Sequence, residues 1–140
     1  MGAGKDLWNE LVMQINKFDL SGWGALYATD AVLIDPTGRY EGREAIEPYL
    51  EESCKPFSDQ RMETVLVIED GDTTVAEWTW TASHTGSLAM PDGSEVPPTG
   101  KALVGAGVTI ITVRDGKIAS ERDYFDSAAV MSQVAPLPGT

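Results

Sequence analysis

The chain has little of the chemistry that disulfides and metal sites need. Its 140 residues include one cysteine, Cys54, and one histidine, His84. A single thiol cannot form an internal disulfide, which fits a reducing compartment. One His and one Cys, without paired spacings, are not typical of a metal site. The sequence therefore predicts no metal and, in the absence of a signal-peptide pattern, a cytoplasmic location.

Positive charge is also scarce. Ten Lys and Arg face 22 Asp and Glu, which gives a net charge of −12, and the basic residues are scattered along the chain. Phosphate binding needs a basic stripe, so the sequence predicts neither a nucleic-acid partner nor binding to an anionic membrane surface. No apolar run approaches the length of a bilayer span. No Gly-rich phosphate loop or Ser nucleophile elbow occurs either, and we expect no cofactor.

The residues that are present predict one α+β domain over residues 1–140. Their apolar fraction of 42% is enough for a buried core. Helical spacing or capping residues predict three helices before residue 55, and long β-type runs dominate after residue 61. The predicted helices cover residues 5–18, a short segment ending near 28, and 42–53, with Pro48 expected to delay or kink the third. The predicted strands cover residues 31–35, 62–68, 74–88, 101–113 and 117–125, followed by a short helix at 127–133.

Three Asp-Gly pairs separate the strands of the second half. They lie at residues 70–71, 92–93 and 115–116, and each is typical of a tight hairpin turn. Helices followed by an antiparallel meander predict a strongly bent sheet that wraps the helices around a hollow. We expect the sheet to bend or bulge at the glycines of the 101–113 strand. Its outer face predicts a homodimer.

Two acidic residues stand in apolar surroundings. Asp35 ends the strand at residues 31–35, and Asp123 lies within the strand at 117–125. A buried carboxylate is costly unless it is paired, hydrogen-bonded or protonated, which makes both residues candidates for proton transfer. Asp35, which precedes Pro36, is equally compatible with an ordinary turn-starting Asp.

Period-two alternation places further side chains beside these acids. Trp78, Trp80 and His84 share one face of their strand, which suits either a cavity wall or a plain core. His84 is either an orienting proton donor or a structural His. The residues expected to contact a substrate are Trp78, Trp80, Phe125, Glu121, Leu33 and Tyr27. Asp126 is expected to cap the closing helix.

Several motifs resemble a known family. Residues 27–36 and 42–46 resemble the first half of the NTF2-like superfamily, which includes the ketosteroid isomerases. The second half is similar to its SnoaL-like polyketide cyclase branch, at residues 84–86, 97–101, 115–118 and 124–126. The resemblance implies an NTF2-like cone in which three N-terminal helices pack in a strongly curved, mostly antiparallel sheet.

The resemblance also implies roles for the two acids. Asp35 falls where ketosteroid isomerases keep their general base, although their oxyanion-hole donors are replaced by Leu11 and Thr109. Asp123 falls where limonene-epoxide hydrolases keep the Asp that activates water. The expected function is cofactor-free acid/base catalysis on a small hydrophobic carbonyl compound, as a SnoaL-like cyclase or isomerase with Asp35, Asp123 and His84 as catalytic residues.

Two other functions remain open. An epoxide hydrolase or epoxide-opening cyclase would depend on Asp123, although Trp78 and Trp80 stand where the hydrolases keep the rest of their triad. A non-catalytic ligand-binding or dimerisation module would have its hollow filled by its own apolar side chains, such as Leu103 and Ile111.

Overall fold

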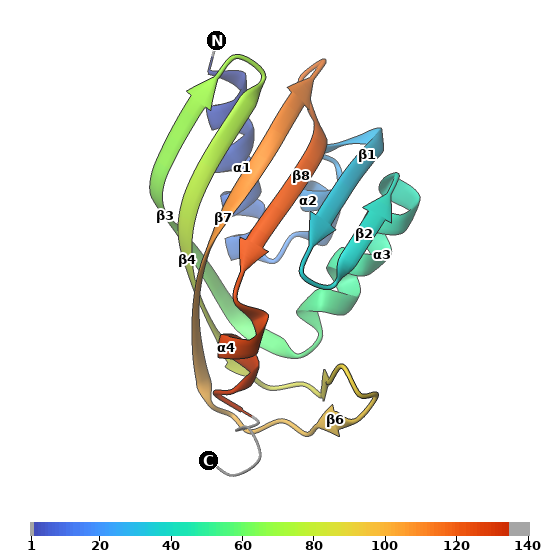
Figure 1. Ribbon diagram of the computed structural model, residues 1–140, viewed down its shortest axis with the longest axis vertical. Coiled ribbons are helices and arrows are strands. Elements are labelled where there is room, and N and C mark those ends of the chain that lie inside the picture. The colour runs from blue at the N-terminus through green and yellow to red at the C-terminus, as the bar shows by residue number, and fades with distance from the viewer. Residues whose placement is uncertain (1, 135–140) are drawn as a thin grey trace.

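The computed structural model describes residues 2–134 and confirms the α+β architecture. Three helices, α1 (Ala3–Lys17), α2 (Leu20–Gly24) and α3 (Arg43–Cys54), lie against one face of a single large sheet (Figure 1). Trp8, Leu11 and Ile15 are buried on one side of α1, as the helical spacing predicts. The sheet curves around the helices, so the fold is the expected cone.

The sheet has six strands in the order β2-β1-β8-β7-β4-β3. All neighbouring pairs are antiparallel except β1 and β8, which run parallel. The strands are β1 (Tyr27–Asp35), β2 (Gly38–Glu41), β3 (Phe57–Asp70), β4 (Thr73–His84), β7 (Ala102–Arg114) and β8 (Lys117–Phe125). The parallel pairing brings the ends of β1 and β8, and with them Asp35 and Asp123, to the same part of the sheet (Figure 1).

The expected hairpin turns are present. The turn after Asp70 joins β3 to β4, and the turn after Arg114 joins β7 to β8. The third turn connects two short strands, β5 (Leu88–Ala89) and β6 (Glu95–Val96), within the long connection from β4 to β7. The closing helix α4 (Ser127–Met131) begins after Asp126, whose carboxylate accepts a hydrogen bond from Ala129 N.

The structure differs from the predicted local structure at four places. Tyr27 and Ala28 belong to β1 and not to the end of the second helix, because Tyr27 is buried and pairs with Ile118 of β8. The strand β2 was not predicted, since its four residues carry no alternating pattern. α3 begins at Arg43, so Pro48, which stands inside it, does not delay its start, and the kink expected as the alternative stays a prediction. No bulge lies at the glycines of β7, since the pairing of β4 with β7 is regular from residue 73 to residue 83. The register shifts lie in the β1–β8, β3–β4 and β7–β8 pairings instead.

The glycines of β7 make room for two tryptophan rings instead of forming the expected bulge. A Cβ atom at Gly107 would lie 2.5 Å from Cζ2 of Trp78, and one at Gly105 would lie 3.3 Å from Cε3 of Trp80. Such contacts are closer than packed carbon atoms tolerate, above all at Gly107. The absence of side chains here lets both tryptophan rings lie against the neighbouring strand.

The outward face of the sheet carries several exposed apolar side chains. Val65, Leu66 and Ile68 of β3, Val104 of β7 and Tyr124 of β8 are all more than half exposed. The homodimer stays a prediction.

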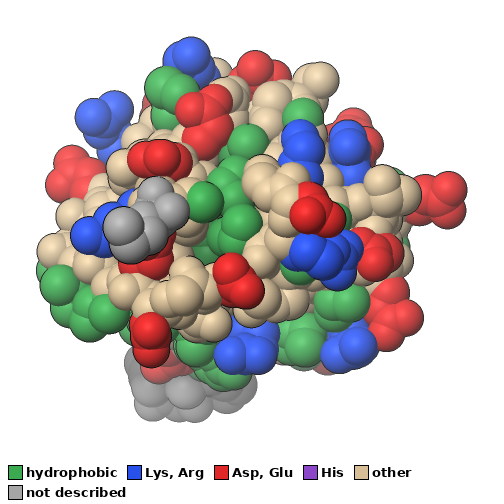
Figure 2. All heavy atoms as spheres, turned by 90° about the horizontal axis from the view of Figure 1, so that it is seen from above, with side chains coloured by type: hydrophobic (Ala, Val, Ile, Leu, Met, Phe, Trp, Pro, Cys, Tyr) green, Lys and Arg blue, Asp and Glu red, His purple; other side chains and the backbone are tan. Residues whose placement is uncertain are grey.

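Surface charge is mixed at one end of the molecule. On the end that carries the N-terminus and the tight turns of the β3–β4 and β7–β8 hairpins, the Lys and Arg side chains are scattered among Asp and Glu (Figure 2). None of the helices within residues 2–134 is long and apolar enough to cross a bilayer.

Candidate active site

A cavity of about 460 Å³ lies between the helices and the concave face of the sheet. All four tryptophans of the chain line it, together with three other aromatic side chains. These residues are Trp8, Trp23, Tyr49, Phe57, Trp78, Trp80 and Phe125. The cavity is therefore open and mainly apolar, and it matches the hollow that the bent sheet predicts.

Five of the six residues expected to contact a substrate line this cavity. They come from β1, β4 and β8 and are Leu33, Trp78, Trp80, Glu121 and Phe125. The rings of Trp78 and Phe125 lie with their centroids 6.2 Å apart in a tilted arrangement. Period-two alternation along β4 and β8 was thus sufficient to assign the inward faces.

The sixth residue, Tyr27, does not line the cavity. Its side chain is 1% exposed and its hydroxyl donates a 2.6 Å hydrogen bond to Oε1 of Glu121. Burial, followed by the charge of Glu121, raises the pKa of Tyr27 well above its ordinary value. Tyr27 is therefore a neutral hydrogen-bond donor that fixes the position of Glu121 from outside the cavity wall. The expectation that Tyr27 contacts a substrate directly is corrected.

Asp123 lines the cavity at the end of a short hydrogen-bonded chain. Thr109, on the neighbouring strand β7, donates from Oγ1 to Oδ1 of Asp123 at 2.6 Å. The indole N–H of Trp78 donates in turn to Thr109 Oγ1 at 2.9 Å. Because the Thr109 hydroxyl accepts from Trp78, its single proton is directed at the carboxyl group, which fixes the orientation of Asp123.

Glu121, which is buried, and Asp123, which is half-buried, form an acidic pair. They are two residues apart on β8, so both side chains point to the concave face. Desolvation raises the pKa of Asp123 well above its ordinary value, and repulsion from Glu121 raises it further. Desolvation also raises the pKa of Glu121. Two close carboxyl groups cannot both ionise cheaply, so the pair tends to hold one proton between them.

Asp35 lines the same cavity in a different setting. Its Oδ1 accepts from the backbone N–H of Thr37 at 2.8 Å and from Thr37 Oγ1 at 2.6 Å, which is the geometry of a turn-starting Asp. Its Oδ2 accepts from the hydroxyl of Tyr49, a residue of α3 whose ring stacks on Tyr40. Both interpretations of the sequence therefore hold for Asp35: it starts a turn and it faces the cavity.

His84 lies outside the set of residues that line the cavity. Its imidazole is completely buried, and Nδ1 lies 2.9 Å from Oγ1 of Thr99. The backbone of His84 also pairs with Gly100 and Lys101. This residue fastens the returning end of the long connection between β4 and β7, and the geometry gives no support to its expected role as a proton donor at the site.

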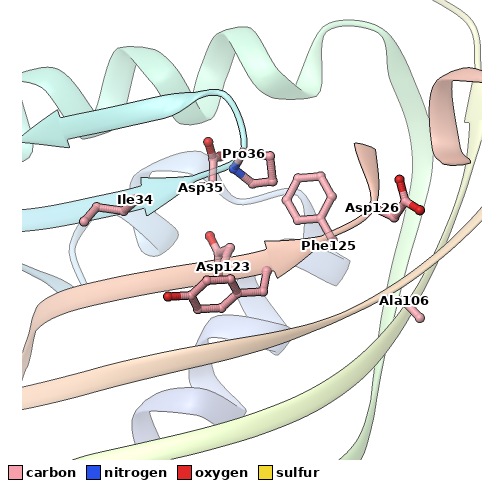
Figure 3. A pocket seen from close by; sticks show the side chains of 8 residues that line it. Ile34, Asp35, Pro36, Ala106, Asp123, Phe125 and Asp126 are labelled. Atoms are coloured by element: carbon pink, nitrogen blue, oxygen red, sulfur yellow. The ribbon is translucent and has the colours of Figure 1, made fainter. Parts of the chain in front are cut away.

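A shallower hollow adjoins the cavity where β1 and β8 separate (Figure 3). Asp35 and Asp123 project from these two strands, with Pro36 and Phe125 beside them on the side of α4 (Figure 3). Asp35, Ala106, Asp123 and Phe125 belong to the walls of both the hollow and the cavity. The two predicted acids therefore stand at a shared wall rather than deep in a closed chamber.

Sequence reasoning missed two polar partners of these acids, Thr109 and Tyr49, and the pairing of Glu121 with Asp123. Thr109 is the one polar side chain at the inward positions of β7, between Gly107 and Ile111, and that pattern could have identified it. The role of Tyr49 had no such signal, since it depends on where α3 packs. Glu121 was expected to bind substrate, and its pairing with Asp123 follows only from the shared face.

The metal-ligating side chains show no clustering. Within residues 2–134, no group of three or more His, Cys, Asp and Glu side chains is arranged to hold a metal ion. The charged groups of the cavity wall are carboxyl groups, and Asp35, Glu121 and Asp123 each accept a hydrogen bond from a hydroxyl. The arrangement can accept, hold and return a proton.

Solved structures of other proteins share this fold. The α+β cone is shared with a protein from Xanthomonas campestris pv. campestris that is named as a provisional polyketide cyclase, at 21% identity and a TM-score of 0.83 over 95% of this chain and 97% of that one. AclR from Streptomyces galilaeus, named as a provisional hydroxylase, matches at 25% identity and a TM-score of 0.82 over 97% of this chain and 83% of AclR.

The family follows from the sequence itself. Residues 8–121 match the family model of the SnoaL-like domain, and the chain belongs to that family. A protein with a ketosteroid isomerase-like fold from Catenulispora acidiphila, solved in complex with trimethylamine, matches at 18% identity and a TM-score of 0.75 over 91% of both chains. The search of curated proteins found no match.

Proposed function

We propose that this protein is a cofactor-independent acid/base enzyme that acts on a small hydrophobic carbonyl compound and catalyses ring closure or isomerisation. The observation that carries the proposal is the Glu121–Asp123 carboxyl pair in the wall of an open aromatic cavity. A general base works best when its pKa lies near the working pH, and burial beside a second acid moves a carboxyl group in that direction.

The proposed reaction begins with proton transfer from carbon. The ionised carboxylate of Asp123 takes a proton from the carbon next to the substrate carbonyl, and the electrons of that C–H bond form the enolate. Thr109 keeps the carboxylate oriented throughout. In an isomerisation Asp123 returns the proton to a different carbon. In a ring closure the enolate carbon instead attacks a second, electrophilic carbonyl, whose oxygen takes the proton.

Glu121 sets the proton affinity of Asp123 in this scheme. Tyr27 donates to one oxygen of Glu121, and the interaction between the two carboxyl groups raises the pKa of Asp123. Asp35 supplies a second acidic group at the shared wall, and its charge also contributes to the raised pKa of Asp123. We assign Asp123 as the principal base and Asp35 as a supporting group that contacts substrate.

The two alternative functions fit less well. Epoxide opening would use Asp123 to activate water, but Trp78 and Trp80 occupy the positions at which the resemblance would need its partners. The binding-module alternative supposed that apolar side chains fill the hollow. Leu103 and Ile111 are buried in the core outside the cavity wall, so they leave its volume open.

The test is a proton-exchange measurement that needs no knowledge of the natural substrate. Proton NMR in D₂O would follow loss of the α-proton signals of 2-tetralone, a compact bicyclic ketone, in the presence of the wild-type protein. We expect exchange above the buffer rate, and a decrease of about 10²-fold in Asp123→Asn. Glu77→Gln, which neutralises an exposed acid on the opposite face of β4, is the matched control.

Circular dichroism would check that each variant is folded. Equal exchange rates in the wild type, Asp123→Asn and buffer would contradict the proposed function. Exchange that persists in Asp123→Asn but disappears in Asp35→Asn would transfer the role of base to Asp35.

A further inference from the structure

The charged groups around the cavity all have the same sign. Asp35, Glu52, Glu121 and Asp123 line it, and no Lys, Arg or His is among the described residues of its wall. Glu52 lies near the rim and is paired with Lys55 at 2.6 Å. The adjoining hollow repeats the pattern, with Asp35, Asp123 and Asp126 and no basic residue among the described residues that line it.

The hydrogen-bond donors beside these acids are already in use. The hydroxyls of Thr37 and Tyr49 donate to Asp35, that of Tyr27 donates to Glu121, and that of Thr109 donates to Asp123. A ligand that enters therefore meets carboxyl oxygens with remaining acceptor capacity and few uncommitted donors. Such a wall suits a ligand group that donates hydrogen bonds and carries positive charge.

The aromatic lining of the cavity also favours a positively charged ligand. Three of the four indole N–H groups donate to protein acceptors: Trp8 to Thr64, Trp78 to Thr109, and Trp80 to Gln60. These rings consequently offer the cavity their carbon framework. Aromatic rings attract ammonium groups electrostatically, and the attraction grows when the cation leaves water.

We propose that the ligand of this cavity is a hydrophobic molecule that carries a protonated amine. Its nitrogen would lie at the wall shared by the cavity and the hollow, against Asp35, Asp123 and the ring of Phe125. This inference deepens the proposed function, because it names the substrate class of the same site: a carbonyl compound that also carries a basic nitrogen.

A negatively charged ligand is disfavoured at this wall. A carboxylate or phosphate group would lose its hydration and face acidic side chains with no cation to pair with, which costs free energy at every approach. A neutral molecule would bury apolar surface and, as an alcohol, could donate one uncharged hydrogen bond to a carboxyl oxygen, but it would lack the attraction between opposite charges. The three classes of ligand therefore differ in affinity for a reason that a matched set of probes can measure.

The probes share a naphthalene ring and differ in charge: 2-(aminomethyl)naphthalene as its cation, 2-naphthalenemethanol, and 2-naphthoate. Isothermal titration calorimetry of the full chain at about pH 7.5, where the amine is protonated, would compare them. We expect the amine to bind about tenfold tighter than the alcohol, and the naphthoate to bind more weakly than the alcohol. Equal affinity of amine and alcohol would overturn the inference.

Site variants separate a local effect from the charge of the whole protein. Asp35→Asn and Asp123→Asn should each weaken amine binding about fivefold or more and leave alcohol binding unchanged. Glu77→Gln removes the same charge from the outward face of β4 and should change neither. A preference for the amine that disappears at about 0.5 M NaCl and responds equally to Glu77→Gln would be general surface attraction, and would overturn the inference.

The outcomes distinguish this inference from the proposed function. Equal binding of amine and alcohol, combined with Asp123-dependent exchange of 2-tetralone, would contradict the inference of an amine ligand but support the proposed acid/base catalysis. Selective amine binding without any exchange of 2-tetralone would support the amine site and contradict the proposed catalysis.

Discussion

Asp35 and Asp123 face the same cavity from neighbouring strands, but their surroundings differ. Asp35 is held by Thr37, two residues away, and by Tyr49 of α3. Asp123 has one donor, Thr109, from another strand, and a second acid, Glu121, on its own strand. The neighbouring acid raises the proton affinity of Asp123, which suits a group that takes a proton from a substrate, whereas the carboxylate of Asp35 is fixed in place by its turn and by Tyr49. The two aspartates are therefore suited to different tasks.

The largest effect that this difference predicts is on catalysis. Asp123→Asn should lower the α-proton exchange rate by about 10²-fold, because it removes the base itself. Asp35→Asn should lower it by about tenfold, because a supporting group acts on binding and charge. The NMR exchange assay measures both. A larger loss in Asp35→Asn than in Asp123→Asn would reverse the roles assigned here.

The next effect concerns the pH dependence of that rate. Glu121→Gln removes the acid that repels the ionised form of Asp123, so the pKa of Asp123 should fall. The low-pH limb of the rate profile should then move to lower pH by about one unit. Rates measured from about pH 4 to 9 would locate the limb, with Glu77→Gln as the control. An unchanged limb in Glu121→Gln would mean that Glu121 does not tune Asp123.

The contrast also explains what the sequence could predict. Strand periodicity identified the inward faces of β4 and β8, and hence both tryptophans and Asp123, because alternation is a local property of the backbone. The turn at Asp35 was equally local. The partners Tyr49 and Thr109 are 14 residues away from Asp35 and Asp123 respectively, and these contacts exist only because separate elements pack together.

His84 failed as a candidate for the same reason. Its strand face was assigned correctly, but Thr99 and the backbone of Lys101 enclose it after the chain returns from the β5–β6 hairpin. Nothing in the residues next to His84 specifies that return. Pro136 and Pro138 predict a frayed tail after the closing helix. Residues 135–140 lie outside the described part of the chain, so this stays a prediction.

A smaller effect concerns stability. The pKa of Asp123 is raised in the folded protein, so the folded state holds a proton that the unfolded chain releases. Stability should therefore fall as pH rises from about 4 toward the raised pKa, by about 1.4 kcal/mol for each unit of the shift. Urea unfolding at several pH values would show this slope, and Asp123→Asn should make it shallower. A slope that is identical in wild type and Asp123→Asn would exclude the raised pKa as its cause.

The smallest expected effect comes from making the same chemical change beside each aspartate. Thr37→Val removes a hydroxyl that donates to Asp35 at an exposed turn, and it should cost about 0.5 kcal/mol of unfolding free energy, since water replaces the donor. Thr109→Val removes the donor to Asp123 and also leaves the Trp78 indole without its acceptor in a buried setting, so the cost should be about 1–3 kcal/mol. Urea unfolding measures both variants on one scale. Equal costs would mean that the two carboxyl groups are equally dependent on their donors, and the distinction between a locally satisfied Asp35 and a strand-supported Asp123 would fail.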